Sequence, residues 1–319
     1  MATQDIPGEQ RTGNQESEWA VSGIDNSTAG LSLIGNKVDS GTLLYSVIGD
    51  PIRQSKSPAM MNRAFRESGI NGIYTAFHIK SERLADFVAG VRAMGIRGVN
   101  VTIPHKLDII PLLDEIDESA QAIGAVNTIV NEDGNLIGYN TDGLGYVRSL
   151  REEAEPELGG KRVLIIGAGG ATRGIIYALA KEGVGSIVIS NRTVERAQVL
   201  VDAFRLQTDI RVVGSEKLKD ACKEADIIIN TTSLGMYPHV EGTPIDTSWL
   251  RPESIASDLI YNPLTTRFLE EAKSRGCRIH GGLGMFVYQG AYAFEYWTGV
   301  PAPVQAMRAA VLEALGYEH

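Results

Sequence analysis

The sequence predicts an α/β protein of two domains, each built on a mostly parallel sheet. Three observations support this prediction. Runs of β-branched residues alternate with helical stretches twice along the chain, first from Leu43 and again from Val163. The connections between these runs are short, as they are in βαβ units. The chain has 319 residues, whereas one hydrophobic core rarely grows beyond about 250–300 residues.

The first series of elements follows a polar stretch. Residues 1–40 lack a sustained hydrophobic period, so we expect a flexible extension in which the apolar patch Leu31–Ile34 is the part that docks. Beyond it we expect strands at Leu43–Gly49, Ile73–Ile79 and Gly98–Thr102, with helices at 58–68 and Glu82–Ala93. Two extended runs within Asn127–Tyr139 flank Glu132-Asp133-Gly134-Asn135, which is typical of a hairpin turn.

The second series starts beyond a charged segment, residues 148–160, which ends in two glycines and indicates a domain boundary. Short runs of largely β-branched residues then predict strands buried on both faces. These runs are Val163–Ile166, Ile187–Ile189, Ile210–Val213, Ile227–Ile229 and Ile255–Leu259. Helical stretches fill most of the gaps, and the C-terminal part is predicted to be helical at Met285–Trp297 and Val304–Leu315.

Composition excludes several classes of function. A net charge of −9 argues against nucleic acid as a partner. No stretch approaches the ~20 apolar residues of a membrane span, and the N-terminal residues lack the apolar core of a secretory signal, so we do not expect export. The only cysteines, Cys222 and Cys277, indicate buried structural thiols, and the histidines form no metal-ligand pattern. We therefore expect a cytoplasmic protein without a metal site.

A glycine-rich turn follows the strand Val163–Ile166. It reads Gly167-Ala168-Gly169-Gly170-Ala171, and a helical pattern continues to Lys181. A strand, a glycine turn and a helix N-terminus together form a pyrophosphate site, since glycines let the backbone approach the ligand and the helix dipole favours an anion. Thr172 stands where the usual motif has its third glycine. The pattern predicts a Rossmann-like nucleotide domain, and the alternative is a tight turn without a ligand.

The end of the next strand indicates the cofactor. NAD enzymes usually place an acidic residue there to accept a hydrogen bond from the ribose 2′-hydroxyl. Here the chain reads Asn191-Arg192-Thr193. Arg192 can pair with a 2′-phosphate, and Asn191 and Thr193 add hydrogen-bonding groups. The sequence therefore predicts NADP, with a solvated surface charge as the alternative interpretation of Arg192.

Several polar clusters lie at predicted strand ends, where parallel α/β sheets bind ligands. Together with the nucleotide turn, these segments resemble the shikimate dehydrogenase family from about Leu43 to the C-terminus. The matching segments are Ser55-Lys56-Ser57-Pro58, residues 100–106 (NVTIPHK), 124–128 (GAVNT), 140–143 (NTDG), 167–171, 191–193, 230–236, 258–263 and 281–285. The resemblance implies an NADP-dependent oxidoreductase of aromatic amino acid and chorismate biosynthesis, which reversibly reduces 3-dehydroshikimate to shikimate.

Lys106 and Asp142 match the catalytic pair of this family. Reduction of a ketone places negative charge on its oxygen while hydride arrives at carbon, so a proton donor must face that oxygen. A lysine beside a carboxylate stays protonated and suits this role, and in the reverse direction it must release its proton. The resemblance makes Lys106 the general acid and base, with Asp142 positioning it and accepting from a ring hydroxyl. The alternative is two solvated surface charges.

The resemblance also implies the residues around the ligands. Ser55 and Ser57 match residues that bind the substrate carboxylate, with Lys56 between them in place of the family's common leucine, and Ser57 could instead cap the following helix. Thr102, Asn127 and Gln289 match residues that bond ring hydroxyls, with local turn or helix bonds as the alternative. Tyr261 matches a residue near the carboxylate, with core packing as its alternative. The remaining matches lie where the family contacts the nicotinamide or closes the cleft: Thr232, Met236, Gly282 and Met285. For the two methionines, core filling is the alternative.

The expected domain organisation follows from the same match. Residues 41–142 form a substrate-binding domain that the C-terminal helices, 283–319, complete, and residues 143–282 form the NADP-binding domain. A cleft lies between them, with a hinge at Gly281–Gly284. Two other functions stay open: a quinate/shikimate dehydrogenase with relaxed substrate and NAD(P) use, and a non-catalytic sensor. The sequence does not determine the oligomeric state and is compatible with a homodimer.

Overall fold

The protein is described from a computed structural model over residues 38–317. The expected extension at residues 1–40 falls almost wholly outside the described residues, and so does the patch Leu31–Ile34. The described residues form a mixed α/β structure with two sheets of six strands each. Within residues 38–317, no helix is both long and apolar enough to cross a membrane.

The first sheet has the strand order β2-β1-β3-β5-β6-β4. Its strands are β1 (Leu43–Gly49), β2 (Gly72–His78), β3 (Gly98–Val101), β4 (Glu115–Ile116), β5 (Thr128–Glu132) and β6 (Asn135–Tyr139). β1 runs parallel to β2 and β3, and β4 runs parallel to β6. β5 is antiparallel to both neighbours because it forms the predicted hairpin with β6, whose turn places Asp133 and Gly134 at φ 51° and 99°.

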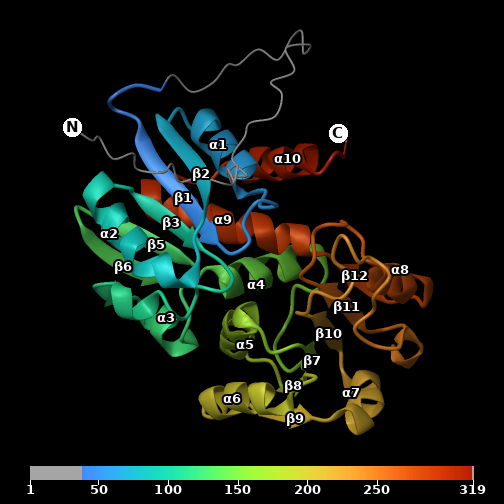
Figure 1. Cartoon of the computed structure of the whole chain (residues 1–319). Coiled ribbons are helices and arrows are strands. Elements are labelled where there is room, and N and C mark those ends of the chain that lie inside the picture. Colours follow the sequence, from blue (N-terminus) through green and yellow to red (C-terminus); the bar gives the residue numbers. More distant parts are fainter. Residues whose placement is uncertain (1–37, 318–319) are drawn as a thin grey trace, which may run out of the picture. The chain divides into compact units, whose positions relative to one another are not determined.

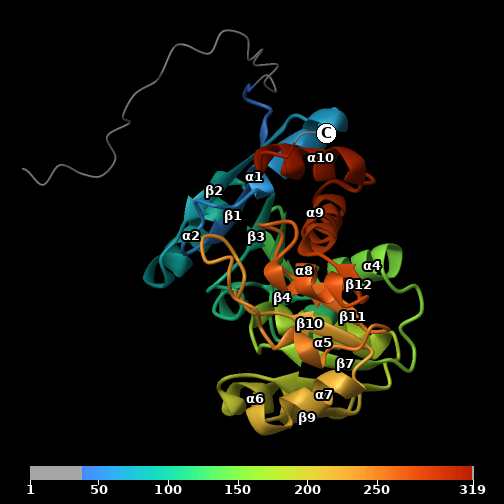
Figure 2. The same ribbon diagram turned by 90° about the vertical axis from the view of Figure 1, so that its right-hand side faces the viewer.

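Two layers of helices cover this sheet. α1 (Ser57–Glu67), α9 (Gly282–Thr298) and α10 (Val304–Ala314) pack on one face, and α2 (Leu84–Met94) and α3 (Glu118–Ile123) on the other (Figures 1 and 2). Successive residues of β1 alternate between these layers: Val47 joins the core under α1 and α9, and Ile48 joins the core under α2. Short 3₁₀ turns occur at Ser81–Arg83 (η1) and Ile110–Leu112 (η2). The C-terminal helices thus complete the first sheet's core.

The second sheet is parallel throughout, in the order β12-β11-β10-β7-β8-β9. Its strands are β7 (Arg162–Ile166), β8 (Ser186–Ser190), β9 (Ile210–Val213), β10 (Ile227–Asn230), β11 (Ile255–Asp258) and β12 (Arg278–His280). Numbered from β7, the order is 3-2-1-4-5-6, that of a doubly wound dinucleotide fold. The order in which successive strands join the sheet reverses between β7 and β10, which lie side by side and run parallel, and ligands bind such folds beyond the carboxyl ends of the strands at that point.

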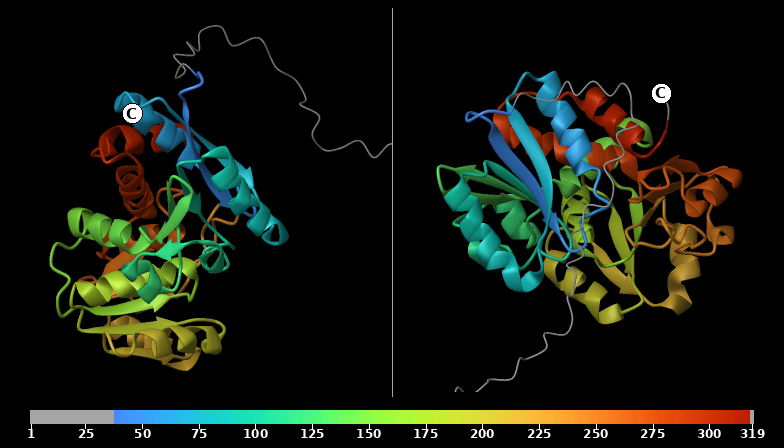
Figure 3. Two further views of the ribbon diagram at one scale, coloured as in Figure 1. Left: turned by 90° about the vertical axis from the view of Figure 1, so that its left-hand side faces the viewer. Right: turned by 45° about the horizontal axis from the view of Figure 1, so that its top comes forward.

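Helices cover both faces of the second sheet (Figure 3). α4 (Asp142–Glu153), α5 (Gly170–Lys181) and α6 (Val194–Phe204) pack on one face, and α7 (Leu218–Glu224) and α8 (Arg267–Ser274) on the other. Two 3₁₀ turns, η3 (Ser215–Lys217) and η4 (Thr247–Trp249), join these elements. Burial on both faces explains why the central strands β7, β8 and β10 are nearly continuous runs of isoleucine, valine and leucine. Cys222 and Cys277 are both buried in the second of these cores, as predicted.

The predicted strands are present within one or two residues of their expected bounds. Four elements were not predicted: β4, α3 and β12, each six residues long or shorter, and the twelve-residue helix α4. The charged segment 148–160 is not simply a linker, because α4 continues through it to Glu153. One face of α4 buries Tyr146, Val147 and Leu150 in the core of the second sheet.

Candidate active site

The glycine turn between β7 and α5 has the geometry of a nucleotide-binding turn. Gly167 has φ +114°, and a Cβ there would lie 2.5 Å from the Thr231 hydroxyl oxygen. A Cβ on Gly169 would meet nothing within 4 Å, so this side of the turn is open to a ligand. The Thr172 hydroxyl accepts a hydrogen bond from the Gly169 N–H at 3.1 Å and lies 2.9 Å from the Thr231 hydroxyl. The threonine in the third glycine position therefore closes the turn without obstructing it.

The ribose end of the predicted nucleotide site lies just beyond β8. The Asn191 side chain donates to the Thr193 carbonyl at 2.7 Å, which shapes the turn into α6. Arg192 is exposed, and no carboxylate within residues 38–317 pairs with its guanidinium. Arg196, an exposed arginine on the first turn of α6, was not among the predicted residues. An unpaired guanidinium at this strand end fits a 2′-phosphate.

Lys106 and Asp142 meet in the structure. The Lys106 ammonium donates to Oδ2 of Asp142 at 2.5 Å, and the two side chains are only 11% and 7% exposed. Lys106 lies in the loop after β3, and Asp142 is the first residue of α4, so two segments 36 residues apart in sequence form the pair. The interpretation of these residues as two solvated surface charges is wrong.

The loop that carries Lys106 is fixed on both sides. His105 is fully buried, and its Nε2 lies 2.6 Å from the Ile79 carbonyl oxygen. The Lys106 carbonyl accepts from the N–H of Val126 at 2.8 Å, which joins this loop to the segment before β5. A Cβ on Gly170 would lie 3.7 Å from Cδ of Lys106, so the lysine stem runs beside the first residue of the nucleotide helix α5.

Asn127 and Gln289 lie around the same pair. The Asn127 amide donates to Oδ1 of Asp142 at 2.9 Å. The Thr141 hydroxyl donates to the Gln289 carbonyl at 3.0 Å, and a Cβ on Gly145 would lie 2.6 Å from the Gln289 backbone nitrogen. Gly145 therefore lets α9 approach α4 closely enough to bring the Gln289 backbone against Thr141. The Gln289 side-chain amide itself donates to the Phe286 carbonyl at 2.7 Å, the local helix bond that was its alternative role. Sequence reasoning missed Thr141, which is fully buried and lies within the quoted segment 140–143.

The two predicted carboxylate-binding serines lie side by side at the start of α1. The Ser55 hydroxyl accepts from the Ser57 N–H at 3.3 Å. The alternative role of Ser57 as a helix cap is wrong, because α1 begins at Ser57 and its N-cap, Lys56, makes no side-chain capping bond. Thr102, the first residue after β3, is partly buried and donates its backbone N–H to Ile48. Its side chain projects toward Gly49, where a Cβ would lie 2.6 Å from the threonine methyl.

Tyr261 stacks on Phe286 with ring centroids 4.3 Å apart, and burial raises the pKa of its hydroxyl to about 12. The ring therefore packs against α9. A neutral hydroxyl can donate a hydrogen bond but carries no charge at physiological pH.

The residues expected near the nicotinamide lie beyond β10 and at the start of α9. The Thr232 hydroxyl donates to Oδ1 of Asn230 at 2.7 Å, and Asn230 donates to the buried Asp258 at 3.1 Å. Burial raises the pKa of Asp258 to about 6, although four hydrogen bonds to its carboxylate act in the opposite direction. Met236 is 45% exposed, so core filling does not explain it, whereas Met285 is buried in the core.

Gly282 is required where α9 begins. A Cβ on it would lie 2.1 Å from the Leu259 carbonyl oxygen, so any side chain would displace the helix start from the end of β11. The chain thus passes from the second sheet back to the first through a contact that only glycine allows.

Comparisons with known proteins agree with this geometry. Three family models match the chain: the shikimate dehydrogenase substrate binding domain over residues 47–129, shikimate / quinate 5-dehydrogenase over 149–238, and the shikimate 5′-dehydrogenase C-terminal domain over 282–312. A relative from Geobacillus sp. (strain WCH70), named shikimate dehydrogenase (NADP(+)), is 53% identical over 272 residues, which cover 85% of this chain and 98% of the relative. The chain belongs to the shikimate dehydrogenase family.

Solved structures of the shikimate dehydrogenase family superpose on most of the chain. A shikimate dehydrogenase in complex with NADP⁺ is 42% identical with a TM-score of 0.83, covering 88% of this chain and 99% of that one. The Thermus thermophilus enzyme in complex with NADP(H) and shikimate is 37% identical with a TM-score of 0.78, covering 85% and 99%. A quinate dehydrogenase from Corynebacterium glutamicum in complex with NAD is 31% identical with a TM-score of 0.80, covering 85% and 99%.

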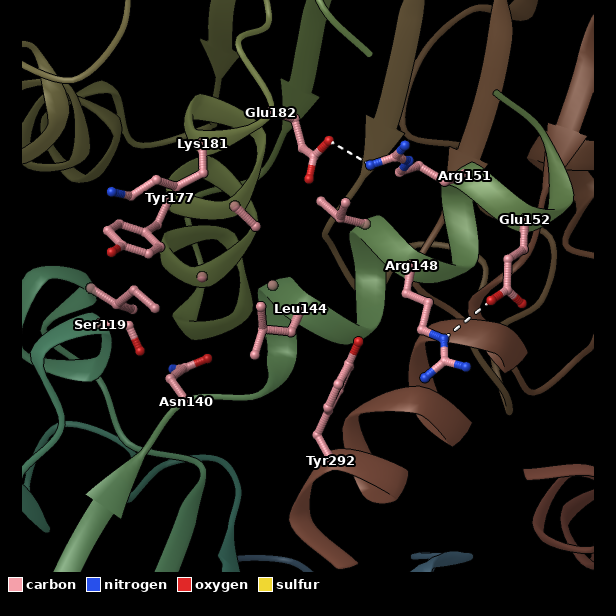
Figure 4. Close-up of a pocket in the computed structure, with 15 residues that line it drawn as sticks. Ser119, Asn140, Leu144, Arg148, Arg151, Glu152, Tyr177, Lys181, Glu182 and Tyr292 are labelled. Carbon is pink, nitrogen blue, oxygen red and sulfur yellow. Dashed lines mark hydrogen bonds and ion pairs between the residues drawn. The ribbon is translucent and has the colours of Figure 1, made fainter. Parts of the chain in front are cut away.

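A separate cavity of about 410 Å³ in this member of the shikimate dehydrogenase family lies between α3, α4, α5 and α9 (Figure 4). At its rim Arg148 pairs with Glu152 at 3.1 Å, and Arg151 pairs with Glu182 at 3.0 Å. Its lining contains none of the predicted catalytic, substrate or cofactor residues. We therefore place the candidate active site by its chemistry, at Lys106 and Asp142, and not by the size of this cavity.

Proposed function

We propose that this protein is an NADP-dependent shikimate dehydrogenase, which reversibly reduces the ketone of 3-dehydroshikimate to the secondary alcohol of shikimate. One observation carries the proposal: a buried ammonium–carboxylate pair lies against the first residue of the helix that follows a dinucleotide-binding turn. The family membership and the names of the relatives support the same activity.

The chain's own residues account for the proton in this reaction. In the reduction, the Nζ–H bond of Lys106 breaks and its proton passes to the carbonyl oxygen as that oxygen gains charge. Asp142 accepts a hydrogen bond from the Lys106 ammonium and so directs it. In the oxidation the neutral amine takes the hydroxyl proton. Bound NADPH supplies the hydride, and NADP⁺ accepts it in reverse.

The substrate carboxylate and hydroxyls have matching donors and acceptors on the described residues. Ser55 and Ser57 lie at the start of α1 and offer neutral hydroxyl donors to a carboxylate. Asn127 and Gln289 lie beside Asp142 and can bond ring hydroxyls. A site built to bond hydroxyl groups strongly rejects analogues that lack them, because its buried polar groups would stay unpaired.

The residues of the nucleotide site fit NADP. The open side of Gly169 and the N-terminus of α5 suit a pyrophosphate, and Gly167 to Ala171 would hold it. Arg192 would pair with the 2′-phosphate, between Asn191 and Thr193. Thr232, Met236, Gly282 and Met285 would border the nicotinamide. No acidic side chain stands at the end of β8 to repel a phosphate.

The assay that tests this function follows NADP⁺ reduction by absorbance with shikimate as substrate. We expect turnover with shikimate and NADP⁺, and a much lower kcat/KM with either quinate or NAD⁺. Comparable kcat/KM values for quinate and for NAD⁺ would favour the quinate/shikimate dehydrogenase with relaxed specificity, to which the similarity to a quinate dehydrogenase structure points. Tight shikimate binding without turnover would favour the non-catalytic sensor.

Three further statements belong to the same proposal. Residues 41–142 with 283–319 form the substrate domain and residues 143–282 the NADP domain, which the two sheets and the packing of α9 and α10 on the first sheet support. We propose that the enzyme acts in the cytoplasm. A homodimer stays a prediction of the sequence, and light scattering of the purified protein tests it.

A further inference from the structure

A chain of hydrogen bonds runs through the first sheet to the Asp142 carboxylate. The Tyr74 hydroxyl donates to Oδ1 of Asn100 at 2.6 Å, and Asn100 donates to the Thr128 hydroxyl at 3.2 Å. Thr128 in turn donates to Oδ1 of Asn127 at 3.0 Å, and Asn127 donates to Oδ1 of Asp142 at 2.9 Å. Four consecutive bonds thus link a residue of β2 to the carboxylate that holds Lys106.

Backbone partners fix the direction of this chain. The Asn100 amide nitrogen also faces the Asn127 carbonyl oxygen at 3.4 Å, which can only accept, so Oδ1 of Asn100 must face Tyr74. Oδ1 of Asn127 accepts from the Thr141 N–H at 2.8 Å, which can only donate, so its amide nitrogen must face Asp142. The orientation of both side-chain amides is therefore determined by backbone groups that can only accept or only donate a hydrogen bond.

Every donor consequently points toward Asp142. Such aligned hydrogen bonds polarise one another, and they do so most strongly away from water. All members are buried: Tyr74 and Asn127 are each 2% exposed, Thr128 is fully buried, and Asn100 is 7% exposed. The last bond reaches Oδ1 of Asp142, while Lys106 occupies Oδ2, so the two sides together fix the plane of the carboxylate.

The strand register explains why these side chains meet. Asn100 on β3 lies directly opposite Thr128 on β5, so their side chains share one face of the sheet. Tyr74 reaches the same face from β2, where Asn62 of α1 accepts from its backbone N–H at 2.8 Å and donates to its carbonyl at 2.8 Å. Tyr74, the first residue of this series of hydrogen bonds, is thus anchored to the helix that begins at Ser57.

We propose that Tyr74 and Thr128 are positioning residues of the reaction, which act through Asn127 to hold the Asp142 carboxylate in the orientation that directs the Lys106 ammonium. Neither side chain is assigned to substrate or cofactor. The Tyr74 hydroxyl also has a hydrogen bond with the Ser57 side chain, so the Thr128 variants carry the test and Tyr74→Phe supports it only if the KM for shikimate is unchanged. The inference rests on the proposed function, because its readout is the dehydrogenase reaction.

Replacement of single hydroxyl groups tests the inference in the full-length protein. Thr128→Val removes the hydroxyl at nearly constant volume and should lower kcat with shikimate by about tenfold, and Tyr74→Phe, at the far end, by about threefold. Thr128→Ser keeps the hydroxyl and should recover most of the activity. The KM for NADP⁺ should stay within twofold of the wild-type value in all three variants, since the series of hydrogen bonds ends at Asp142, on the substrate side of the site.

The sequence offers a matched control for Tyr74. Tyr45 lies opposite it in the β1–β2 register, is equally buried, and stacks on Phe65. Within residues 38–317 the Tyr45 hydroxyl makes no side-chain hydrogen bond. Tyr45→Phe should therefore leave kcat unchanged, whereas a general effect of a missing phenol hydroxyl in this core would lower it as much as Tyr74→Phe does.

Introducing Thr128→Val into the Asp142→Asn variant distinguishes a positioning role of Thr128 from a general structural defect. In Asp142→Asn the carboxylate is already gone, so adding Thr128→Val should change the residual rate by less than twofold, while a structural defect would lower it by the same factor as in the wild type. Equal rates for Thr128→Val and wild type, or a Thr128→Ser variant as slow as Thr128→Val, would overturn the inference and leave the proposed function intact. A wild-type protein that does not oxidise shikimate would instead refute the proposed function, and the inference with it.

Discussion

The Lys106 ammonium and the Asp142 carboxylate lie 2.5 Å apart at a position where their side chains are only 11% and 7% exposed. Burial strengthens the attraction between the two charges and makes either charge costly without the other. The pair also joins the first sheet to α4, which packs on the second sheet. The proposed chemistry therefore lies where the last residue of the proposed substrate domain begins a helix that packs on the second sheet.

Lys106→Ala removes the proposed acid and base. We expect kcat to fall by about 10²- to 10⁴-fold, the usual cost of losing a general acid–base group, with shikimate still bound. Steady-state kinetics and calorimetric titration with shikimate measure the two effects separately. Lys80→Ala, a change to an exposed lysine, is the control and should be silent. A kcat like that of the wild type would remove Lys106 from the mechanism.

Arg192→Ala tests the choice of cofactor. The variant loses the guanidinium that would pair with the 2′-phosphate, so the KM for NADP⁺ should rise by about tenfold or more while the KM for NAD⁺ changes little. Kinetics with both cofactors at fixed shikimate provide the measurement. An equal rise for both cofactors would mean that another group, such as Arg196, holds the phosphate.

The sequence was sufficient to predict most of the long strands and helices, because their apolar residues recur regularly and are bounded by glycine or proline, but it did not predict the twelve-residue helix α4. It did not predict β4, which pairs two residues, Glu115 and Ile116, with β6. Pairing of this kind depends on a neighbouring strand that is distant in sequence, and no local pattern reports it. α3 was missed for a similar reason: its capping residue Asp117 is recognisable, but the helix has only six residues.

The candidate site was predictable where residues sit in recognisable segments, as Lys106 and Asp142 do. Tyr74 and Asn62 illustrate what was not predictable. Their bond depends on how α1 packs on β2, which a single sequence does not state. Thr141 was missed although it lies beside Asp142, because a buried threonine has no charge or unusual spacing to mark it.

Stability toward acid should depend on His280. Its Nδ1 lies 2.9 Å from the Ser257 hydroxyl and its Nε2 lies 2.7 Å from the Ser149 hydroxyl, and burial, with a smaller effect of Arg308, lowers its pKa from 6.5 to about 4. Between these two pH values the unfolded chain binds the proton and the folded chain does not. Stability is therefore lost as pH falls from 6.5 to 4, by up to about 3 kcal/mol.

The comparison with His280→Gln isolates this contribution. Asp258, whose burial raises its pKa to about 6, acts in the opposite sense, since the folded protein binds that proton first and loses the associated stability as pH rises through 6. This effect is common to both proteins and cancels in their difference. Urea unfolding at several pH values should show that the stability gap narrows toward pH 4. Parallel curves would show that His280 does not titrate between folded and unfolded states as described.

Gly145→Ala tests whether the close approach of α4 and α9 sets the position of Gln289. Alanine favours a helix over glycine by about 1 kcal/mol, so propensity alone predicts stabilisation. The new Cβ would, however, lie 2.6 Å from the Gln289 backbone nitrogen, which cannot move without α9. We expect the clash to prevail, with a loss of about 1–3 kcal/mol in the free energy of unfolding, a higher KM for shikimate, and an unchanged KM for NADP⁺.

Gly90→Ala is the matched change in the interior of α2. Its Cβ would meet only the flexible end of Met94 at 3.3 Å, so helix propensity should prevail and the protein should be unchanged or stabilised by up to about 1 kcal/mol. Opposite signs for the two variants are expected because the same methyl group meets backbone in one place and a flexible side chain in the other. If Gly145→Ala proved as benign as Gly90→Ala, α9 would be free to shift away from α4, and Gln289 would owe its position to other contacts.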